Sequence, residues 1–264
     1  MDVGLECRSL CFAYGQSAVL SDISFDVEQG KFCAILGRNG SGKTTLLHCL
    51  NKILVPDQGR IIVQNRDITT LSQGEIAKHI SLVPQEHLDI FPFKVLDVVV
   101  MGRTPFLSLT RRPGPGDYEL ARDALNALNA GTLAHKNFNR ISGGERRIAL
   151  LARALTQAAG VMLLDEPTNH LDFNNQFRLL STIKSLCREK GISIVASMHD
   201  PNLASLFADD VIMVKSGTIM AKGPVRKVMT QAHINALYET RVSPVALNNR
   251  TDLFFPAPFT KEMP

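Results

Sequence analysis

Residues 37–44 of this 264-residue chain combine glycines, a lysine and a threonine at a spacing suited to phosphate, in the order Gly37-Arg38-Asn39-Gly40-Ser41-Gly42-Lys43-Thr44, followed by Thr45. The segment fits the pattern G-x-x-x-x-G-K-T without a mismatch. The glycines let backbone N–H groups curl around phosphate oxygens, the lysine reaches the outer phosphates, and the threonine hydroxyl suits a position at Mg²⁺. The segment therefore predicts a site for a nucleoside triphosphate with Mg²⁺.

Two carboxylates follow an apolar run further along the chain, in Val161-Met162-Leu163-Leu164-Asp165-Glu166. The run is typical of a buried strand, so Asp165 and Glu166 are expected at a strand end. In enzymes with this phosphate-binding loop, the aspartate helps to hold Mg²⁺, and the neighbouring glutamate can polarise the water that attacks the γ-phosphate. A solvated strand end is the simpler interpretation, and the loop upstream argues against it.

A third motif is Ile141-Ser142-Gly143-Gly144-Glu145. Ser142 and Glu145 have the spacing of a capping box at the start of a helix, which would explain these two residues by itself. It would not explain two glycines in the first helical turn, because they cost helix stability. Since N–H groups at a helix start bind anions, the motif also predicts a second phosphate-binding surface.

The elements around these motifs predict an α/β fold. Strands are expected over residues 5–10, 19–27 and 32–36, with further β structure over 59–63 and 67–68, and a hairpin over 211–221. Residues 86–140 interrupt this pattern with a Pro/Gly-rich loop and a helix starting at Asp117. A later helix has Phe173, Phe177 and Leu180 on one face, and residues 240–264 predict a strand and an extended tail packed on the core.

The composition of the chain excludes several classes of protein. A net charge of +4 is weak, and the longest basic runs, Arg111-Arg112 and Arg146-Arg147, are interpreted as solvated surface. Five cysteines without a C-x-x-C motif favour free thiols in a reducing compartment. The acidic N-terminus predicts no signal peptide, and no stretch approaches the ~20 apolar residues of a membrane span. A cytoplasmic protein is expected, with membrane association only through a partner.

The three motifs in this order resemble the ATP-binding subunit of an ABC transporter, over residues 5–235. Ile141–Glu145 is similar to the family signature L-S-G-G-Q, with Glu145 in place of the glutamine. The resemblance implies a P-loop NTPase core with an antiparallel β subdomain and an inserted helical subdomain over roughly 86–158. The ABC ATPase domain would span 1–240, and 241–264 would be a C-terminal extension.

Four further residues are carried over from the family's motifs. Tyr14 resembles the aromatic residue that stacks on adenine, and Gln85 resembles the glutamine that senses Mg²⁺ and relays to the membrane subunit. Asn169-His170-Leu171-Asp172 resembles the D-loop, which places Asp172 at the subunit interface and among the nucleotide-binding residues. His199 resembles the switch histidine at the γ-phosphate. Taken singly, three of them have an ordinary interpretation: Tyr14 as a sheet aromatic, Gln85 as a loop amide and His199 as a strand-end histidine.

The resemblance implies ATP hydrolysis that powers import. Glu166, His199, Gln85 and Lys43 would be catalytic, and Thr44, Gln85 and Asp165 would serve Mg²⁺. The active unit would be a homodimer, with ATP between one P-loop and Ser142, Gly143, Gly144 and Glu145 of the other subunit. Two alternative functional hypotheses remain. One is a soluble ABC-type ATPase acting on ribosomes or DNA, against which the weak basic clustering argues. The other is a nucleotide-gated interaction module without turnover.

The helical insertion indicates a particular subfamily of these ATPases. Phe91-Pro92-Phe93, Val95–Val99 and Met101–Ser108 resemble importer ATPases for iron–siderophore, haem and cobalamin, although some relatives serve molybdate or other chelates. This implies an integral membrane permease as partner, indirectly a substrate-binding protein, no nucleic acid, and a peripheral position on the cytoplasmic face of the cell membrane. An exposed residue such as Arg103 is expected on the docking surface. The alternative is that Gly102–Pro105 only ends a helix.

Overall fold

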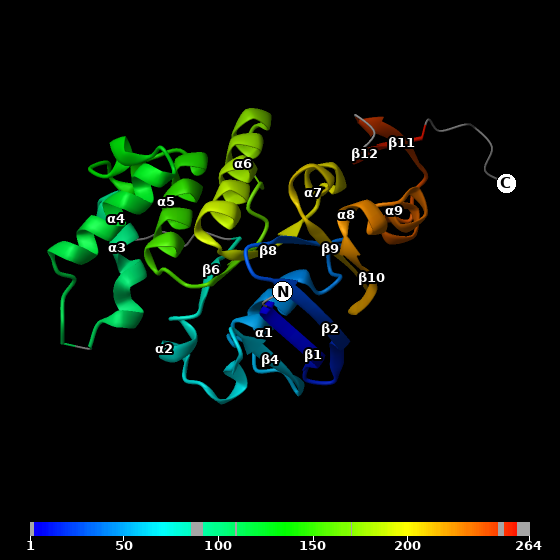
Figure 1. Cartoon of the computed structure of the whole chain (residues 1–264), viewed down its shortest axis with the longest axis horizontal. Helices are drawn as coiled ribbons and strands as arrows, with labels where there is room; N and C mark the ends of the chain where they lie inside the picture. The colour runs from blue at the N-terminus through cyan, green and yellow to red at the C-terminus, as the bar shows by residue number, and fades with distance from the viewer. Residues whose placement is uncertain (1–2, 86–91, 109, 170, 248–250, 258–264) are drawn as a thin grey trace.

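The computed structural model describes residues 3–85, 92–108, 110–169, 171–247 and 251–257. In Figure 1, a mixed sheet runs through the middle of the molecule, with an antiparallel sheet below it. A group of helices lies on one side and the C-terminal elements lie on the other. The predicted fold class, an α/β core with an antiparallel sheet and a group of inserted helices, is confirmed.

The central sheet has six strands in the order β10-β9-β3-β8-β7-β6. All neighbours are parallel except β9 and β10, which form the predicted hairpin. The strands are β3 (Phe32–Leu36), β6 (Ile80–Val83), β7 (Val161–Leu164), β8 (Ser193–Met198), β9 (Asp210–Lys215) and β10 (Thr218–Pro224). Because β3, β7 and β8 are neighbours and parallel, the loops that follow them meet at one edge of the sheet.

Both faces of the central sheet are covered, which explains why β3 is buried at every residue. Its alternate side chains enter different cores, as the period of two in a strand requires. Phe32 and Leu36 belong to the core on the helical side, whereas Cys33 and Ile35 belong to the core shared with the antiparallel sheet. A parallel strand covered on both faces reads in the sequence as a continuous apolar run.

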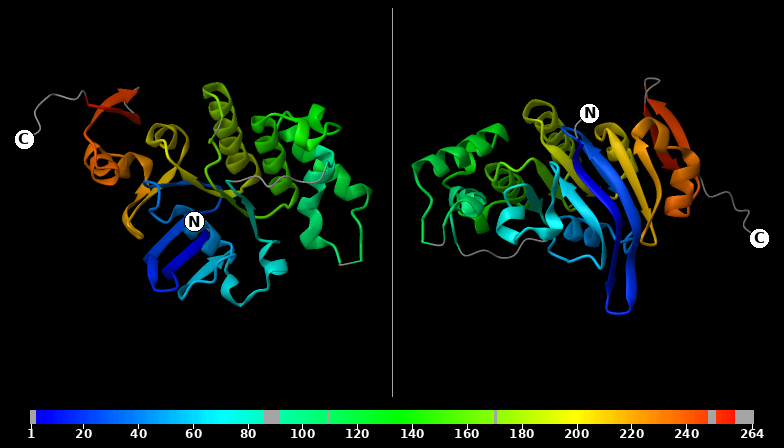
Figure 2. Two further views of the ribbon diagram at one scale, coloured as in Figure 1. Left: turned by 180° about the vertical axis from the view of Figure 1, so that it is seen from behind. Right: turned by 60° about the horizontal axis from the view of Figure 1, so that its bottom comes forward.

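The antiparallel sheet has the order β2-β1-β4-β5 and packs with α1 against the central sheet. Its long β1–β2 hairpin extends from the molecule in the right-hand view of Figure 2. Both hairpin strands are longer than the sequence predicted, and Ile68 begins a 3₁₀ helix, η1, instead of continuing a strand. The elements are β1 (Val3–Tyr14), β2 (Ser17–Glu28), α1 (Lys43–Leu50), β4 (Gln58–Val63), β5 (Arg66–Asp67), η1 (Ile68–Thr70) and α2 (Gln73–Ile76).

The inserted helices pack on one another at the β6 edge of the central sheet. They are α3 (Val95–Val100), α4 (Pro115–Ala127), α5 (Gly143–Thr156) and the 3₁₀ helices η2 (Met101–Phe106), η3 (Gly131–Leu133) and η4 (Phe138–Arg140). Gly102 sits directly against α5, since a Cβ there would lie 2.2 Å from the carbonyl oxygen of Arg153. This close approach fixes η2 against the end of α5.

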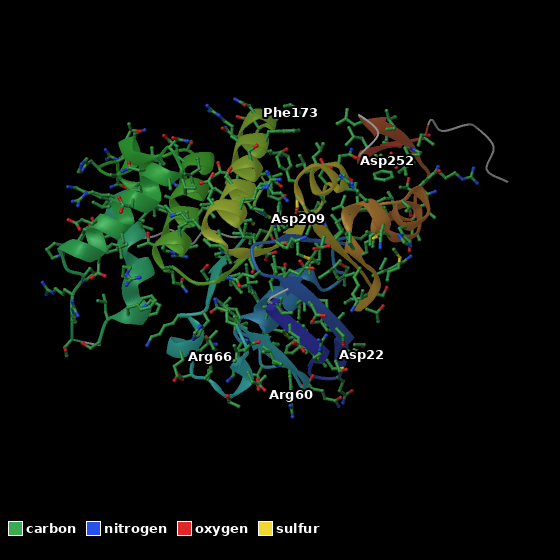
Figure 3. The ribbon with its side chains drawn as sticks, in the orientation of Figure 1. Asp22, Arg60, Arg66, Phe173, Asp209 and Asp252 are labelled. Atoms are coloured by element: carbon green, nitrogen blue, oxygen red, sulfur yellow. The ribbon has the colours of Figure 1, made fainter. Side chains whose placement is uncertain are left out.

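Beyond β7 come α6 (Phe173–Lys190), α7 (Pro201–Phe207), α8 (Val225–Val228), α9 (Gln231–Tyr238), β11 (Val242–Leu247) and β12 (Thr251–Pro256). Residues 242–247 and 251–256 form a hairpin of β11 and β12 instead of the single strand that the sequence predicted, and residues 258–264 of the predicted tail lie outside the described residues. Phe173 lies at the tip of α6 (Figure 3) and is 77% exposed, and its ring contacts that of Phe177 on the predicted face, with 4.7 Å between the ring centroids. Within the described residues, no helix combines the length and hydropathy that crossing a bilayer requires.

Candidate active site

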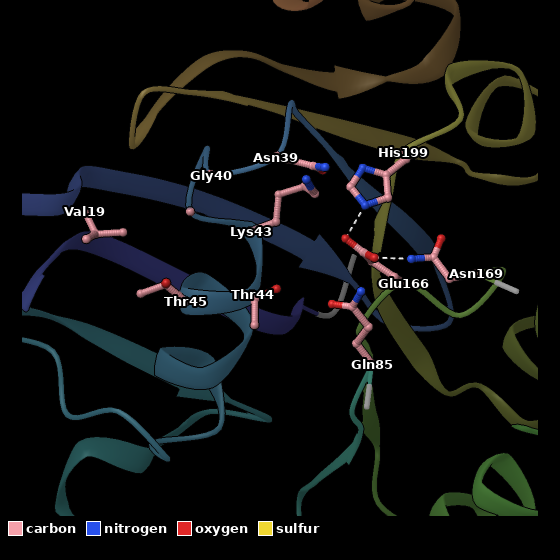
Figure 4. Close-up of a pocket in the computed structure, with 11 residues that line it drawn as sticks. Val19, Asn39, Gly40, Lys43, Thr44, Thr45, Gln85, Glu166, Asn169 and His199 are labelled. Atoms are coloured by element: carbon pink, nitrogen blue, oxygen red, sulfur yellow. Dashed lines mark hydrogen bonds and ion pairs between the residues drawn. The ribbon is translucent and has the colours of Figure 1, made fainter. Parts of the chain in front are cut away.

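A cleft of about 830 Å³ opens between the loop after β3 and the ends of β7 and β8. Figure 4 shows the side chains that enter it from both sides. Nine of the residues predicted to bind and hydrolyse nucleotide line this cleft, although they come from distant parts of the chain. The lining consists of Val19, Asn39, Gly40, Gly42, Lys43, Thr44, Thr45, Gln85, Glu166, Asn169 and His199.

The loop between β3 and α1 has the geometry that its glycines predicted. Gly40 and Gly42 have φ angles of 79° and 101°, which side chains with a Cβ rarely adopt. A Cβ on Gly37 would lie 2.4 Å from both the hydroxyl oxygen of Ser41 and the carbonyl oxygen of Val214. The side chain of Lys43 is folded into the loop, where its Nζ donates to the carbonyl of Gly37 at 2.8 Å. Its burial lowers the pKa of Lys43.

Two observations fit this loop to an anion. Gly42 is the N-cap of α1, and no side chain caps the first turn of that helix, so its N–H groups face the loop. The hydroxyl of Ser41 is buried and has no hydrogen-bond partner within the described part of the chain. A buried polar atom without a partner is costly, and phosphate oxygens are suited to accept from it. The loop therefore fits the phosphates of a nucleotide.

Asp165 lies directly behind the loop and is 2% exposed. Its Oδ1 accepts hydrogen bonds from Thr44 Oγ1 at 3.2 Å and from Ser197 Oγ at 2.6 Å. A threonine hydroxyl beside a carboxylate is the oxygen donor set that Mg²⁺ prefers when it also binds phosphate. Gln85 lines the same cleft, so the three predicted Mg²⁺ residues fit that ion.

Glu166 has a left-handed backbone with φ of 47°, an uncommon conformation for a residue with a side chain. Two hydrogen bonds fix the backbone of Glu166. Ser197 Oγ accepts from its N–H at 2.8 Å, and the guanidinium of Arg147 donates to its carbonyl at 2.5 Å. This turn directs the carboxylate into the cleft (Figure 4), where one oxygen contacts His199 Nε2 and the other accepts from Asn169 Nδ2. The Glu166 carboxylate is thus oriented by three segments of the chain.

Arg147 corrects the interpretation of Arg146-Arg147 as solvated surface. Its side chain is 4% exposed and donates to the carbonyls that follow β6 and β7. One of these is Pro84, immediately before Gln85, at 2.7 Å. The sequence carried no signal for this role, because a charged residue in the first turns of a helix usually faces solvent. Asn169 was likewise named only as part of the D-loop, not as a partner of Glu166.

The Ser142 turn, residues 141–145, lies outside the cleft, and it lines a separate groove beside α6. Its capping box is present: Ser142 Oγ accepts from the N–H of Glu145 at 3.2 Å, and the Glu145 carboxylate accepts from the N–H of Ser142 at 2.9 Å. Lys136 also pairs with Glu145. A Cβ on Gly143 would meet nothing within 4 Å, so packing within this chain does not require that glycine.

Besides Gly37, Ser41 and the Ser142 turn, three predicted nucleotide-binding residues do not line the cleft. Tyr14 is 54% exposed at the end of β1, where its ring meets Phe12 edge-on. Arg38 pairs with Glu239 on the surface. Asp172 caps α6 by accepting from the N–H of Asn175 at 2.8 Å. Their contacts with nucleotide remain predictions, and His170 of the D-loop lies outside the described residues.

Comparison with known proteins agrees with this geometry. Residues 20–169 match the family model for ABC transporters. The chain is 36% identical to a probable iron chelatin transport ATP-binding protein of Helicobacter pylori, covering 93% of this chain and 97% of that one. It is 37% identical to the hemin import ATP-binding protein HmuV of Thermobifida fusca, covering 92% and 85%.

Among solved structures, the chain resembles a subunit of an ABC transporter assigned to the metal-chelate type, in an inward-facing conformation. The TM-score is 0.86 with 30% sequence identity, and the match covers 98% of this chain and 99% of the other. The family model spans more than half of the chain and includes the phosphate-binding loop, the Ser142 turn and the two carboxylates. The chain therefore belongs to the ATP-binding cassette family of ABC transporters, whose members are ATPases.

Proposed function

We propose that this chain is the ATP-hydrolysing subunit of an importer for a metal chelate, such as an iron–siderophore, haem or cobalamin. It acts through a separate membrane permease, at the cytoplasmic face of the cell membrane, and receives cargo indirectly from a substrate-binding protein. The relatives named for iron chelatin and hemin support the cargo class. The observation that carries hydrolysis is the Glu166 carboxylate, which is directed into the cleft that the phosphate-binding loop lines.

The chemistry is positioning and charge stabilisation around the γ-phosphate. Glu166 accepts a proton from the attacking water as general base, while His199 and Lys43 contact the γ-phosphate. When Mg²⁺ is bound, it neutralises phosphate charge, and Thr44, Asp165 and Gln85 would hold it or its water ligands. His199 is suited to its role because its ring already contacts Glu166 at the mouth of the cleft.

The active unit is a homodimer in which each ATP lies between one P-loop and the partner subunit's Ser142 turn. Two features of the structure support this arrangement. The Ser142 turn does not line the cleft of its own chain, and Gly143 leaves open space at a helix start that no packing within the chain requires. A helix N-terminus brought to the γ-phosphate would supply N–H donors that one subunit lacks.

Coupling to the permease is assigned to the segment after Gln85. Phe93, Met101 and Phe106 are 37–40% exposed there, which puts three large apolar side chains at the surface of one short segment. Phe91 lies outside the described residues. Arg103 is not the exposed docking residue that the sequence predicted. Its side chain is 15% exposed, pairs with Asp117 at 3.1 Å and donates to the carbonyl of Thr156 at 3.2 Å, so it is a structural residue.

The coupling proposal is tested with Met101→Glu in vesicles that contain the permease and the purified chain. The new charge should prevent apolar docking, so chelate uptake should fall at least ten-fold, while the ATPase rate of the isolated subunit changes less than two-fold; both are order-of-magnitude expectations from the loss of an apolar contact. Leu120→Glu is the matched control, because Leu120 is an apolar residue of similar exposure, 45%, that belongs to α4 and not to this segment. Unchanged uptake with Met101→Glu would place the docking surface elsewhere.

A further inference from the structure

The backbone at His199 is held by a residue near the C-terminal end of the chain. The phenol of Tyr238, in α9, donates a hydrogen bond of 3.0 Å to the carbonyl of His199. Tyr238 is partly buried, and burial together with the charge of Asp200 raises the pKa of its phenol. The phenol therefore keeps its proton and stays a donor throughout the physiological pH range.

A second link holds the chain three residues further on. The side-chain amide of Asn202 donates to the carbonyl of Phe254 at 3.1 Å and accepts from the N–H of Phe254 at 2.7 Å. Phe254 belongs to β12 and is 4% exposed, so it fixes the C-terminal hairpin against α7. Paired bonds between an amide and one residue's backbone define both distance and orientation.

Only Asp200 and Pro201 lie between His199 and Asn202, and the backbone of this segment is also fixed locally. Asp200 caps α7 by accepting from the N–H groups of Asn202 at 2.7 Å and Leu203 at 3.2 Å. The backbone from His199 to Asn202 is therefore fixed by the local cap and by two contacts from the C-terminal elements. In Figure 1, α9 and the β11–β12 hairpin lie on the same side of the molecule as α7. These elements follow residue 169, the end of the match to the family model.

We propose that Tyr238 is a positioning residue for hydrolysis, which orients His199 toward Glu166 and the γ-phosphate, and that β12 supports this orientation through Asn202. The side chain of His199 is 34% exposed, so its ring is not fixed by tight packing. A rotation of its backbone would move the ring away from the carboxylate. This inference rests on the proposed role of His199 in hydrolysis.

The test compares Tyr238→Phe in two backgrounds, the wild-type chain and His199→Ala. In the wild-type background, loss of one positioning hydrogen bond should lower kcat about five-fold with little change in KM for ATP. In the His199→Ala background, which has already lost the ring, Tyr238→Phe should cause no further loss. Asn202→Ala should act in the same direction in the wild-type background. Tyr118→Phe in α4 is the matched control and should leave kcat unchanged.

The outcomes separate this inference from the proposed function. If His199→Ala lowers turnover and Tyr238→Phe causes the same fold loss in both backgrounds, Tyr238 does not act through His199 and the inference is wrong. If His199→Ala keeps full turnover, the proposed role of His199 fails, and the inference fails with it. NMR of the imidazole protons gives a readout independent of rate. The His199 signal should shift with Tyr238→Phe and not with Tyr118→Phe, whereas an unmoved signal would overturn the positioning role.

Discussion

The carboxylate of Glu166, the proposed general base, is held at the cost of an uncommon backbone conformation. A left-handed residue with a side chain costs about 1 kcal/mol or more, and such residues concentrate at functional sites. Glu166 accepts this conformation because Ser197 and Arg147 satisfy its N–H and carbonyl, and its carboxylate then faces the cleft between His199 and Asn169. The strain is thus compensated by hydrogen bonds that also orient the carboxylate.

We expect Glu166→Gln to separate binding from hydrolysis. The amide keeps the size of the side chain and its contact with Asn169, but it cannot accept the proton of water. Turnover should fall by a factor on the order of 10²–10⁴, the usual loss for a general base, while ATP affinity stays near wild type. Steady-state ATPase assays and equilibrium nucleotide binding measure the two quantities. As a comparison, Lys43→Ala should weaken binding itself. A Glu166→Gln rate close to wild type would remove Glu166 from the mechanism.

At the scale of elements, α5 connects the Ser142 turn to the ends of β6 and β7 in the same chain. The guanidinium of Arg147 binds carbonyls after β6 and after β7, so a shift of α5 is resisted by both strands. Gly102 fixes the far end of α5 by close contact of its backbone with the carbonyl of Arg153. The helix is therefore held at both ends against its neighbours.

Gly102→Ala should loosen this packing. The added Cβ would lie 2.2 Å from a backbone oxygen that cannot turn aside, so the free energy of unfolding should fall by about 1–3 kcal/mol, as in other overpacked sites. Urea unfolding followed by circular dichroism measures the change. Gly116→Ala in α4 is the matched control, because a Cβ there meets nothing within 4 Å. It should be neutral or stabilising, since alanine favours helix. Equal losses for both variants would contradict the contact.

At the scale of the whole molecule, nucleotide should join two chains through the Ser142 turn. Gly143→Arg tests this without removing the cap, because its Cβ meets nothing within the chain. In the Glu166→Gln background, ATP should produce a dimer, and Gly143→Arg should return it to a monomer that still binds ATP. Light scattering and nucleotide binding measure the two states. Gly116→Arg, also in the first turn of a helix, should leave the dimer intact. A dimer that persists with Gly143→Arg would leave Ser142 as a helix cap only.

The sequence by itself determined the parts of the site that are local. The phosphate-binding loop was predicted because eight consecutive residues, with glycines at the left-handed positions, define its backbone. Asp165 and Glu166 were predicted because an apolar run places them at a strand end. The capping box of Ser142 and Glu145 was predicted because its partners are three residues apart. In each case the signal and the structure lie within one short segment.

Only the tertiary structure decided which distant groups meet. Glu166 lies 33 residues from His199, Arg147 lies 63 residues from Pro84, and Tyr238 lies 39 residues from His199. Hydrophobic periodicity in the sequence assigns a side chain to one face of its own helix or strand. It does not identify the element that packs against that face. Arg147 was therefore predicted to be solvent-exposed, although the ends of β6 and β7 bury it. Such contacts depend on how the elements pack, and packing joins residues that no short pattern connects.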